Sequence, residues 1–178
     1  LALKNKEKIC IYGDYDVDGV SSTALLMTVF TKLGFNIDYY LPDRHSEGYG
    51  LHIESLQKLI PKYDLLITVD CGITALDEVD YAKDKIDMII TDHHLPREIL
   101  PDAFAIINPT QTQCNYPNKN LCSVGVAFKL CQGLYQSLNK DIHELENYLD
   151  IVALGTIADI VPLVDENRRI VKKGLANI

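Results

Sequence analysis

The sequence lacks any apolar run that approaches the roughly 20 residues needed by a membrane-spanning helix, and nothing near Leu1 resembles a signal peptide. We therefore expect a cytoplasmic protein with no membrane partner. The five cysteines contain no CxxC pair and are odd in number, which argues against both a disulfide framework and a zinc knuckle. We expect reduced thiols that lie mostly in the core.

Basic side chains are outnumbered: 17 Lys and Arg stand against 25 Asp and Glu, for a formal net charge of -8. Nucleic-acid-binding proteins usually carry a basic surface, so this balance argues against a general nucleic-acid coat. The objection weakens if many of the acids bind divalent cations, because bound cations reverse the local field that a phosphate meets.

The length bounds the domain count. With 47% of its 178 positions hydrophobic, the chain can bury one substantial core but is too short for two ordinary domains, so we predict a single domain over residues 1–178. Because the chain begins without methionine and stops just after a charged stretch, we expect it to be part of a longer protein.

Short apolar segments rich in Ile, Val and Tyr predict buried strands at 8–12, 37–41, 65–69, 88–91 and 104–107. Helical patterns lie between them, at 22–33, 52–59 and 75–85. This alternation predicts an α/β fold, with an open, mainly parallel five-stranded sheet and helices on both faces. The C-terminal part is expected to be helical, at 124–138 and 142–157.

Acidic and imidazole side chains directly follow three of the predicted strands. In open parallel sheets, ligands bind where the carboxyl ends of the strands converge. We therefore expect one edge of the sheet to gather the residues that follow the first strand (Asp14, Asp16, Asp18), the third (Asp70) and the fourth (Asp92, His93, His94).

The three aspartates at alternate positions 14, 16 and 18 would repel one another unless a cation compensates, and a hard divalent metal would do so. A calcium loop of the EF-hand type is excluded, because its closing glutamate would stand where the apolar Leu25 lies. For these three residues alone, metal binding and a solvated acidic turn both stay open. Either Ser21 or Ser22 is expected to cap the following helix.

Asp70 ends an apolar run, where an unpaired carboxylate would be costly, so it needs a cation or several donors. Its alternative role is to cap a helix starting near Ile73. Side chains adjacent along a strand point in opposite directions, so one of His93 and His94 is expected to bind metal while the other faces elsewhere. Asp92 is then a natural partner that orients an imidazole.

Asp159 lies near the end of a predicted helix, where the helix dipole disfavours a negative charge, so something positive should sit beside it. With it, the candidate ligands reach about the number that two bridged metals require: Asp14, Asp16, Asp18, Asp70, His93 and Asp159.

Four ordered motifs resemble those of the DHH phosphoesterases: GDYDVDG at 13–19, TVDCG at 68–72, TDHH at 91–94 and GTIAD at 155–159. Three longer segments resemble the RecJ group of this family: LPDRHSEGYG at 41–50, VGVAFKL at 124–130 and GTIADIVPLVDENR at 155–168. The resemblance covers nearly the whole chain, from about residue 8 to 174.

The resemblance implies a ligand assignment. The first metal would be held by Asp14, Asp16 and Asp70, and the second by Asp18, Asp70, His93 and Asp159, with Asp70 bridging. His94 would face the substrate phosphate, with catalytic roles also for Asp70 and Asp92, and Arg44 would help to hold the phosphate end of the strand. Oxygen ligands with one imidazole suit two divalent ions, preferably manganese and alternatively magnesium, better than zinc.

The implied activity is two-metal hydrolysis of phosphodiesters, as a 5′ to 3′ exonuclease on single-stranded DNA in recombination and repair. A water activated between the ions would attack phosphorus in line, so no protein nucleophile is needed. RecJ-like proteins carry a second domain and further nucleic-acid-binding modules, joined by a helix that would begin near 168–175. We therefore expect this chain alone to bind single-stranded DNA weakly, and the sequence predicts no particular protein partner.

Two alternatives remain. The first is another DHH hydrolase acting on a small phosphate such as pyrophosphate, a cyclic dinucleotide or a short oligonucleotide. Such relatives tend to begin the first motif with His and to include Pro, whereas this chain has Asp14 and no proline there. The second is a non-catalytic RecJ-like scaffold, which would be expected to lose motif acids that are all present here.

Overall fold

The computed structural model describes residues 1–178 and contains one all-parallel sheet of five strands in the order β2-β1-β3-β4-β5. The strands are β1 (Lys8–Tyr12), β2 (Asn36–Tyr40), β3 (Leu65–Val69), β4 (Asp87–Thr91) and β5 (Ala105–Ile107). The predicted open α/β sheet is confirmed, and each strand end lies within a residue of its predicted position.

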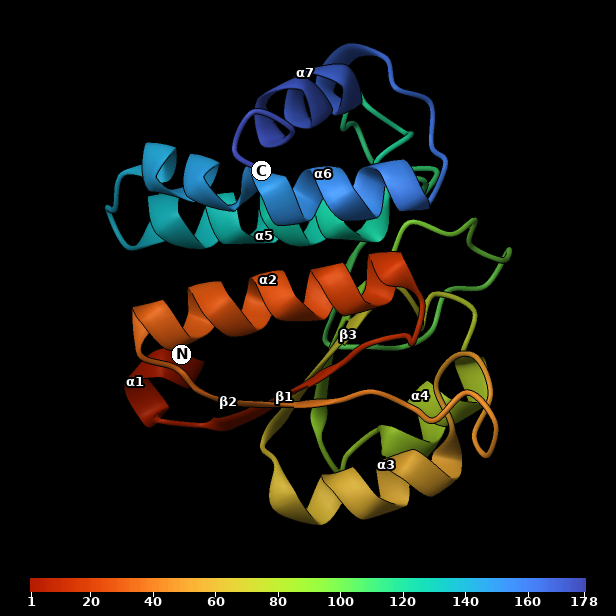
Figure 1. Cartoon of the computed structure of the whole chain (residues 1–178). Coiled ribbons are helices and arrows are strands. Elements are labelled where there is room, and N and C mark those ends of the chain that lie inside the picture. The colour runs from red at the N-terminus through yellow and green to blue at the C-terminus, as the bar shows by residue number, and fades with distance from the viewer.

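Helices cover both faces of this sheet (Figure 1). On one face, α2 (Val17–Leu33) and α5 (Ser123–Ser137) contact the strands, α6 (Leu149–Ala158) packs on α2, and α7 (Asp165–Gly174) packs on α6. The other face carries α3 (Ile53–Leu59) and α4 (Leu76–Ala82). The rest are α1 (Ala2–Asn5) and two 3-10 segments, η1 (Ile60–Lys62) and η2 (Ile142–Tyr148). No helix is both long and apolar enough to cross a membrane.

The strands are apolar along their length because both sheet faces are buried. In β1, Ile9 and Ile11 join the core under α2 and α5, whereas the alternate residues Cys10 and Tyr12 join the core under α3 and α4. Because both of its faces are buried, the sheet is a rigid support for the residues that follow the strand ends.

Helix α2 begins at Val17, well before its predicted start at residue 22, and its N-cap is Asp16, whose side chain accepts a hydrogen bond from Gly19 N at 2.9 Å. The expectation that Ser21 or Ser22 caps this helix is therefore wrong, since both are buried within it. The apolar pattern missed the first turn because Val17 and its neighbour Val20 face solvent.

Two segments of the C-terminal part differ from expectation. The helix predicted at 142–157 is divided into η2 and α6, and only Leu145 of η2 is buried, so the apolar stripe does not continue through it. The helix anticipated near 168–175 begins earlier, at Asp165.

The close packing of α7 on α6 depends on Gly174. A Cβ atom there would lie 2.1 Å from Leu149 O and 2.5 Å from Ala153 Cβ. We expect Gly174→Ala to lower the free energy of unfolding by about 1–3 kcal/mol through overpacking. Gly133 in α5 is the matched control, because a Cβ there meets nothing within 4 Å. Gly133→Ala should stabilise by about 0.5–1 kcal/mol. Urea denaturation measures both, and equal effects would contradict the close approach.

Candidate metal centre

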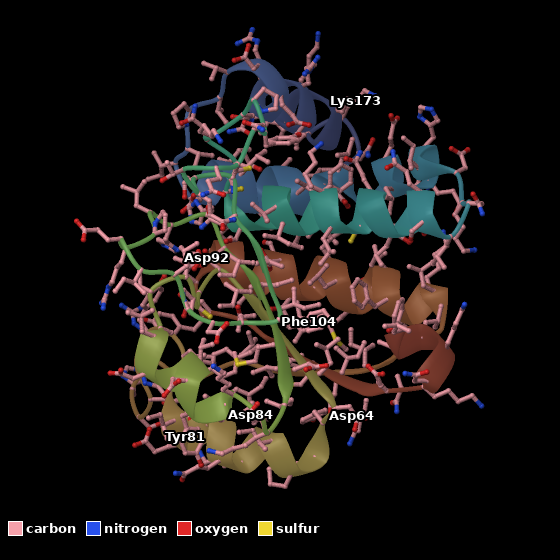
Figure 2. All side chains as sticks on the ribbon, turned by 180° about the vertical axis from the view of Figure 1, so that it is seen from behind. Asp64, Tyr81, Asp84, Asp92, Phe104 and Lys173 are labelled. Atoms are coloured by element: carbon pink, nitrogen blue, oxygen red, sulfur yellow. The ribbon has the colours of Figure 1, made fainter.

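The strand order reverses between β1 and β3, which creates a crevice at the carboxyl edge of the sheet. Asp14 follows β1, Asp70 follows β3 and Asp92 follows β4, so the fold brings these side chains to that crevice. Figure 2 shows Asp92 at this edge and Asp64, which precedes β3, at the opposite one. The predicted gathering of strand-end residues is therefore what the structure shows.

A first group of acids consists of Asp14, Asp16 and Asp70, which can each place one carboxylate oxygen within 4.8 Å of the others. Asp14 and Asp70 are each 1% exposed, and neither Asp14 oxygen has a hydrogen-bond partner. Because an unpartnered buried carboxylate is costly, this group fits a cation better than a solvated turn. Asp16 is exposed and also caps α2.

The backbone around these acids is tightly constrained. A Cβ on Gly19 would lie 2.6 Å from Asp14 O, so glycine there lets the first turn of α2 pack on the Asp14 backbone. Asp70 has a left-handed φ of 65°, which costs a non-glycine residue roughly 1–2 kcal/mol. Two hydrogen bonds hold it: Asp70 N donates to Thr91 O at 3.1 Å, and Tyr49 Oη donates to Asp70 O at 3.2 Å.

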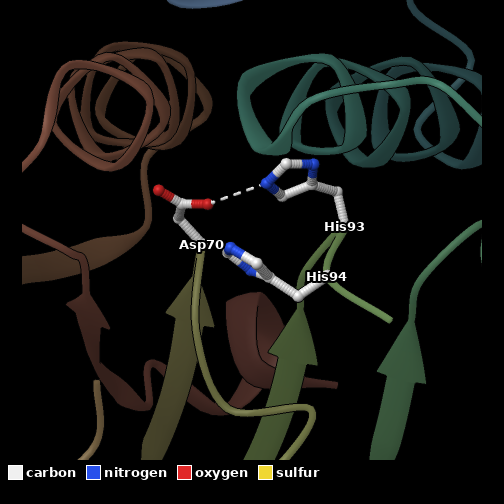
Figure 3. A group of neighbouring side chains, drawn as sticks. All are labelled: Asp70, His93 and His94. Atoms are coloured by element: carbon white, nitrogen blue, oxygen red, sulfur yellow. Dashed lines mark ion pairs between the residues drawn. The ribbon is translucent and has the colours of Figure 1, made fainter. Parts of the chain in front are cut away.

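A second group consists of Asp18, His93 and Asp159. His93 Nε2 lies 3.4 Å from Asp70 Oδ1 and 4.0 Å from Asp18 Oδ2, while His93 Nδ1 lies 3.7 Å from Asp159 Oδ2. Figure 3 shows Asp70 and His93 facing each other. Asp159 is the C-cap of α6, and His93 supplies the positive partner expected beside it. A third set, Asp70, His93 and His94, can also place one ligand atom each within 4.8 Å of the others, so Asp70 links the two groups.

Asp18 also caps a distant helix. Its Oδ2 accepts from Ser123 N at 2.6 Å and its Oδ1 from Val124 N at 2.9 Å, at the start of α5. The sequence analysis missed this contact. The one available signal was that Cys122, the N-cap of α5, offers no side-chain acceptor for the helix. Each oxygen of Asp18 keeps further acceptor capacity for a cation.

The two histidines do not point in opposite directions as expected. Their ring centroids lie 4.4 Å apart, because both residues follow the end of β4, where strand alternation no longer applies. Their bonds nevertheless differ, since His94 Nδ1 lies 2.7 Å from Asp92 Oδ1. Asp92 also accepts from Ile73 N at 3.0 Å, but the helix considered for capping by Asp70 begins only at Leu76 and has no side-chain cap.

Tyr49 is a neighbour of the site that the sequence analysis did not single out. Its hydroxyl lies 3.2 Å from His94 Nε2, and its ring meets the imidazole edge-on. Tyr49 lies in the 41–50 motif, but a loop tyrosine carries no periodic signal that would indicate such a contact. Arg44, from the same motif, is exposed and stacks over the Tyr15 ring at 5.6 Å, so it borders the acids without entering either group.

The acids form ion pairs only with histidines, never with lysine or arginine. Burial raises the pKa of Asp14, Asp70 and Asp159, and it raises that of Asp18 to about 6. Burial also lowers the pKa of His93, but Asp70 and Asp159 outweigh it and raise that pKa to about 9. The site therefore has a deficit of positive charge.

The donor set tests whether a metal would fit. Buried oxygens of Asp14, Asp70 and Asp159 have no hydrogen-bond partner. Five aspartates and one imidazole offer the oxygen-rich environment that hard divalent cations prefer. The residues present therefore fit divalent cations.

Known proteins are similar to this chain in sequence and in fold. The model of the DHH family, N-terminal domain, matches residues 8–156. The single-stranded-DNA-specific exonuclease RecJ of Bacillus subtilis is 47% identical over 99% of this chain and 22% of its own length. A crystal structure of exonuclease RecJ bound to manganese has a TM-score of 0.90 at 37% identity, covering 98% of this chain and 44% of that one. RecJ of Thermus thermophilus in complex with Mn²⁺ has a TM-score of 0.84 at 33% identity, covering 98% of this chain and 25% of that one.

The chain spans about a fifth to a third of the length of the curated relatives that it matches. The family model covers most of the chain, from β1 to α6. The protein is a member of the DHH family.

Proposed function

We propose that residues 1–178 form a single catalytic domain that hydrolyses phosphodiesters with two divalent cations. The observation that carries this proposal is the convergence of buried, unpartnered carboxylate oxygens and one imidazole in the crevice between β1 and β3. Such a constellation makes physical sense only around cations.

Two ligand sets share Asp70 in this proposal. The first cation is held by Asp14, Asp16 and Asp70, and the second by Asp18, Asp70, His93 and Asp159. Manganese is preferred and magnesium is possible, because oxygen ligands dominate. The manganese complexes of RecJ relatives support this choice. When bound, the two cations lower the pKa of a water and stabilise the charge that develops on phosphate.

The protein's own contribution begins with Asp92, which is buried and holds His94 Nδ1 at 2.7 Å. This bond raises the pKa of His94 and favours its charged form. His94 Nε2 is then a donor that can meet a phosphate oxygen of the substrate in place of Tyr49 Oη. Arg44 adds a second positive group for the phosphate end of the strand.

The substrate we propose is single-stranded DNA, degraded from its 5′ end in recombination and repair. Relatives named single-stranded-DNA-specific exonuclease RecJ support the choice of single-stranded DNA, and the 5′ polarity and the role in recombination and repair are part of the proposal itself. A cavity of about 870 Å³ beside His94, with Tyr49, Leu76 and Arg97 in its walls, leaves room for a nucleotide. The net charge of -8 gives residues 1–178 by themselves a low affinity for DNA.

A manganese-supplemented assay tests the proposal. The chain and a full-length RecJ relative are incubated with 5′-labelled single strands, duplexes, pyrophosphate and cyclic dinucleotides. We expect mononucleotides to be released from single strands, faster with the full-length relative. Hydrolysis of the small phosphates alone would favour the other branch of the family. No hydrolysis of any substrate would favour the non-catalytic scaffold.

His94→Ala separates catalysis from metal binding. Because Asp92 orients His94 as a donor to the substrate phosphate, we expect turnover to fall by roughly 10²–10³-fold, the usual range for removing one donor that stabilises transition-state charge. Manganese affinity, measured by calorimetry, should stay within about twofold, well below the 10–100-fold cost of losing a ligand's support. His143→Ala, at an exposed histidine in η2, is the control and should change neither quantity. A collapse of metal affinity in His94→Ala would show that this histidine is a ligand.

A further inference from the structure

Asn167 is a buried polar residue of α7 that lies outside both ligand groups. It is 1% exposed, and its amide makes three hydrogen bonds. Nδ2 donates to Asn120 O at 2.7 Å and to Pro162 O at 3.1 Å, while Oδ1 accepts from Asn118 Nδ2 at 3.2 Å. One side chain therefore joins α7 to two other segments of the chain.

The first segment leads into α5. Asn120 lies just before the helix whose first amides, those of Ser123 and Val124, donate to the carboxylate of Asp18. Because these two short bonds fix the carboxylate, the position of the α5 N-terminus sets the position of Asp18. The bond from Asn167 to Asn120 O anchors the approach to that terminus.

The second segment leads away from Asp159. Ile160 follows with a left-handed φ of 58°, which is strained for a β-branched residue, and its side chain is 87% exposed. Between Ile160 and Val164, the bond from Asn167 to Pro162 O is the single one made by a side chain. Asn167 therefore restrains the loop that directly follows Asp159.

We propose that Asn167 is a positioning residue for the second cation site. It acts on Asp18 and Asp159, which belong to that site, and makes no bond to the segments that carry Asp14, Asp16 and Asp70. This inference rests on the proposed two-cation function. A single buried amide would thus align Asp18 and Asp159, which lie far apart in the sequence.

The test uses Asn167→Asp, which keeps the shape and the acceptor for Asn118 but removes both donors. Manganese binding is measured by calorimetry and by metal content after gel filtration. We expect the wild type to bind two ions. In the variant, the manganese affinity of the first cation site should stay within about twofold of the wild-type value. The affinity of the second cation site should weaken by roughly 10–100-fold, the usual effect of losing a residue that supports metal ligands.

Glu166→Gln is the matched control. Glu166 is the neighbouring residue of α7, accepts from Tyr116 Oη at 2.7 Å and forms an ion pair with Lys129, so it also ties α7 to other segments. It does not contact Asn120 or Pro162. Its replacement should lower the melting temperature and leave both manganese affinities unchanged.

Asn118→Ala is the milder variant if Asn167→Asp does not fold by circular dichroism. It removes only the bond that orients the Asn167 amide, so the second affinity should fall by a smaller factor, about twofold to fivefold. Equal weakening of both affinities, or no change in either, would overturn the inference while leaving the two-cation proposal intact. A wild-type chain that binds fewer than two ions would overturn the proposed function and the inference with it.

Discussion

Replacing Asp70 is expected to abolish manganese-dependent hydrolysis while the fold survives. Asp70 stands between the two ligand groups, so its loss would dismantle both proposed cation sites. We expect Asp70→Ala to lower the rate by more than about 10³-fold, the upper range for removing one electrostatic group from an active site. The assay is release of mononucleotides from 5′-labelled single strands, by a full-length relative with the matching substitution and by this chain.

Asp70→Asn separates charge from backbone geometry. Asn tolerates the left-handed φ of 65° better than Ala does, so this variant keeps the local conformation while removing the negative charge. It should be as inactive as Asp70→Ala. Both variants should remain folded, because burial already disfavours the charged form of this carboxyl group and raises its pKa.

Asp64→Asn is the matched control. Asp64 accepts from Lys8 N at 2.7 Å at the opposite edge of the sheet, so its replacement should leave hydrolysis unchanged. Full activity in either Asp70 variant would rule out a bridging role. Loss of activity with loss of the folded signal in circular dichroism would instead assign Asp70 a purely structural role.

The metal-free chain is expected to lose stability as pH rises from about 4 to about 9. The folded-state pKa of Asp18 is raised from 3.8 to about 6, and that of His93 from 6.5 to about 9. In both cases the folded chain binds more protons than the unfolded chain, so the free energy of unfolding falls with pH. The Asp18 contribution is present below pH 3.8 and lost through pH 6, and the His93 contribution is present below pH 6.5 and lost through pH 9.

The size of this effect is on the order of 3 kcal/mol for Asp18 alone, since each unit of pKa shift corresponds to about 1.4 kcal/mol. Urea denaturation in EDTA across this pH range measures it. Saturating manganese should remove most of the pH dependence of the free energy of unfolding, because the cations replace the bound protons and bind only the folded site. The increase in melting temperature with manganese should therefore be largest near pH 9. Stability that rises with pH in EDTA would contradict these assignments.

The sheet and the location of the site could be predicted because both depend on local patterns. The apolar runs of β1 and β3 mark strands buried on both faces, and the residues that follow them must lie at the carboxyl edge. This reasoning is enough to bring Asp14 and Asp70 together. The ligand roles themselves stay a prediction.

Contacts that join distant segments could not be predicted. The amides of Ser123 and Val124 reach Asp18 across more than a hundred residues, and no local pattern indicates that pairing. The prediction that His93 and His94 point in opposite directions was wrong for a related reason. It assumed that the alternation of side chains in a strand continues beyond Thr91, where β4 ends. The start of α2 was missed because its first turn faces solvent, so an apolar stripe could not reveal it.

The bonds between Asp18 and the start of α5 can form only late in synthesis, because their donors lie more than a hundred residues after Asp18. During synthesis, the sheet can be completed once β5 has emerged, but neither the α5 amides nor Asp159 exists at that stage. A ribosome-bound chain of that length would contain Asp18 and His93 but lack Asp159, so the second group would be incomplete. On the proposed two-cation function, hydrolysis of phosphodiesters would therefore begin only after α5 and α6 have packed onto α2.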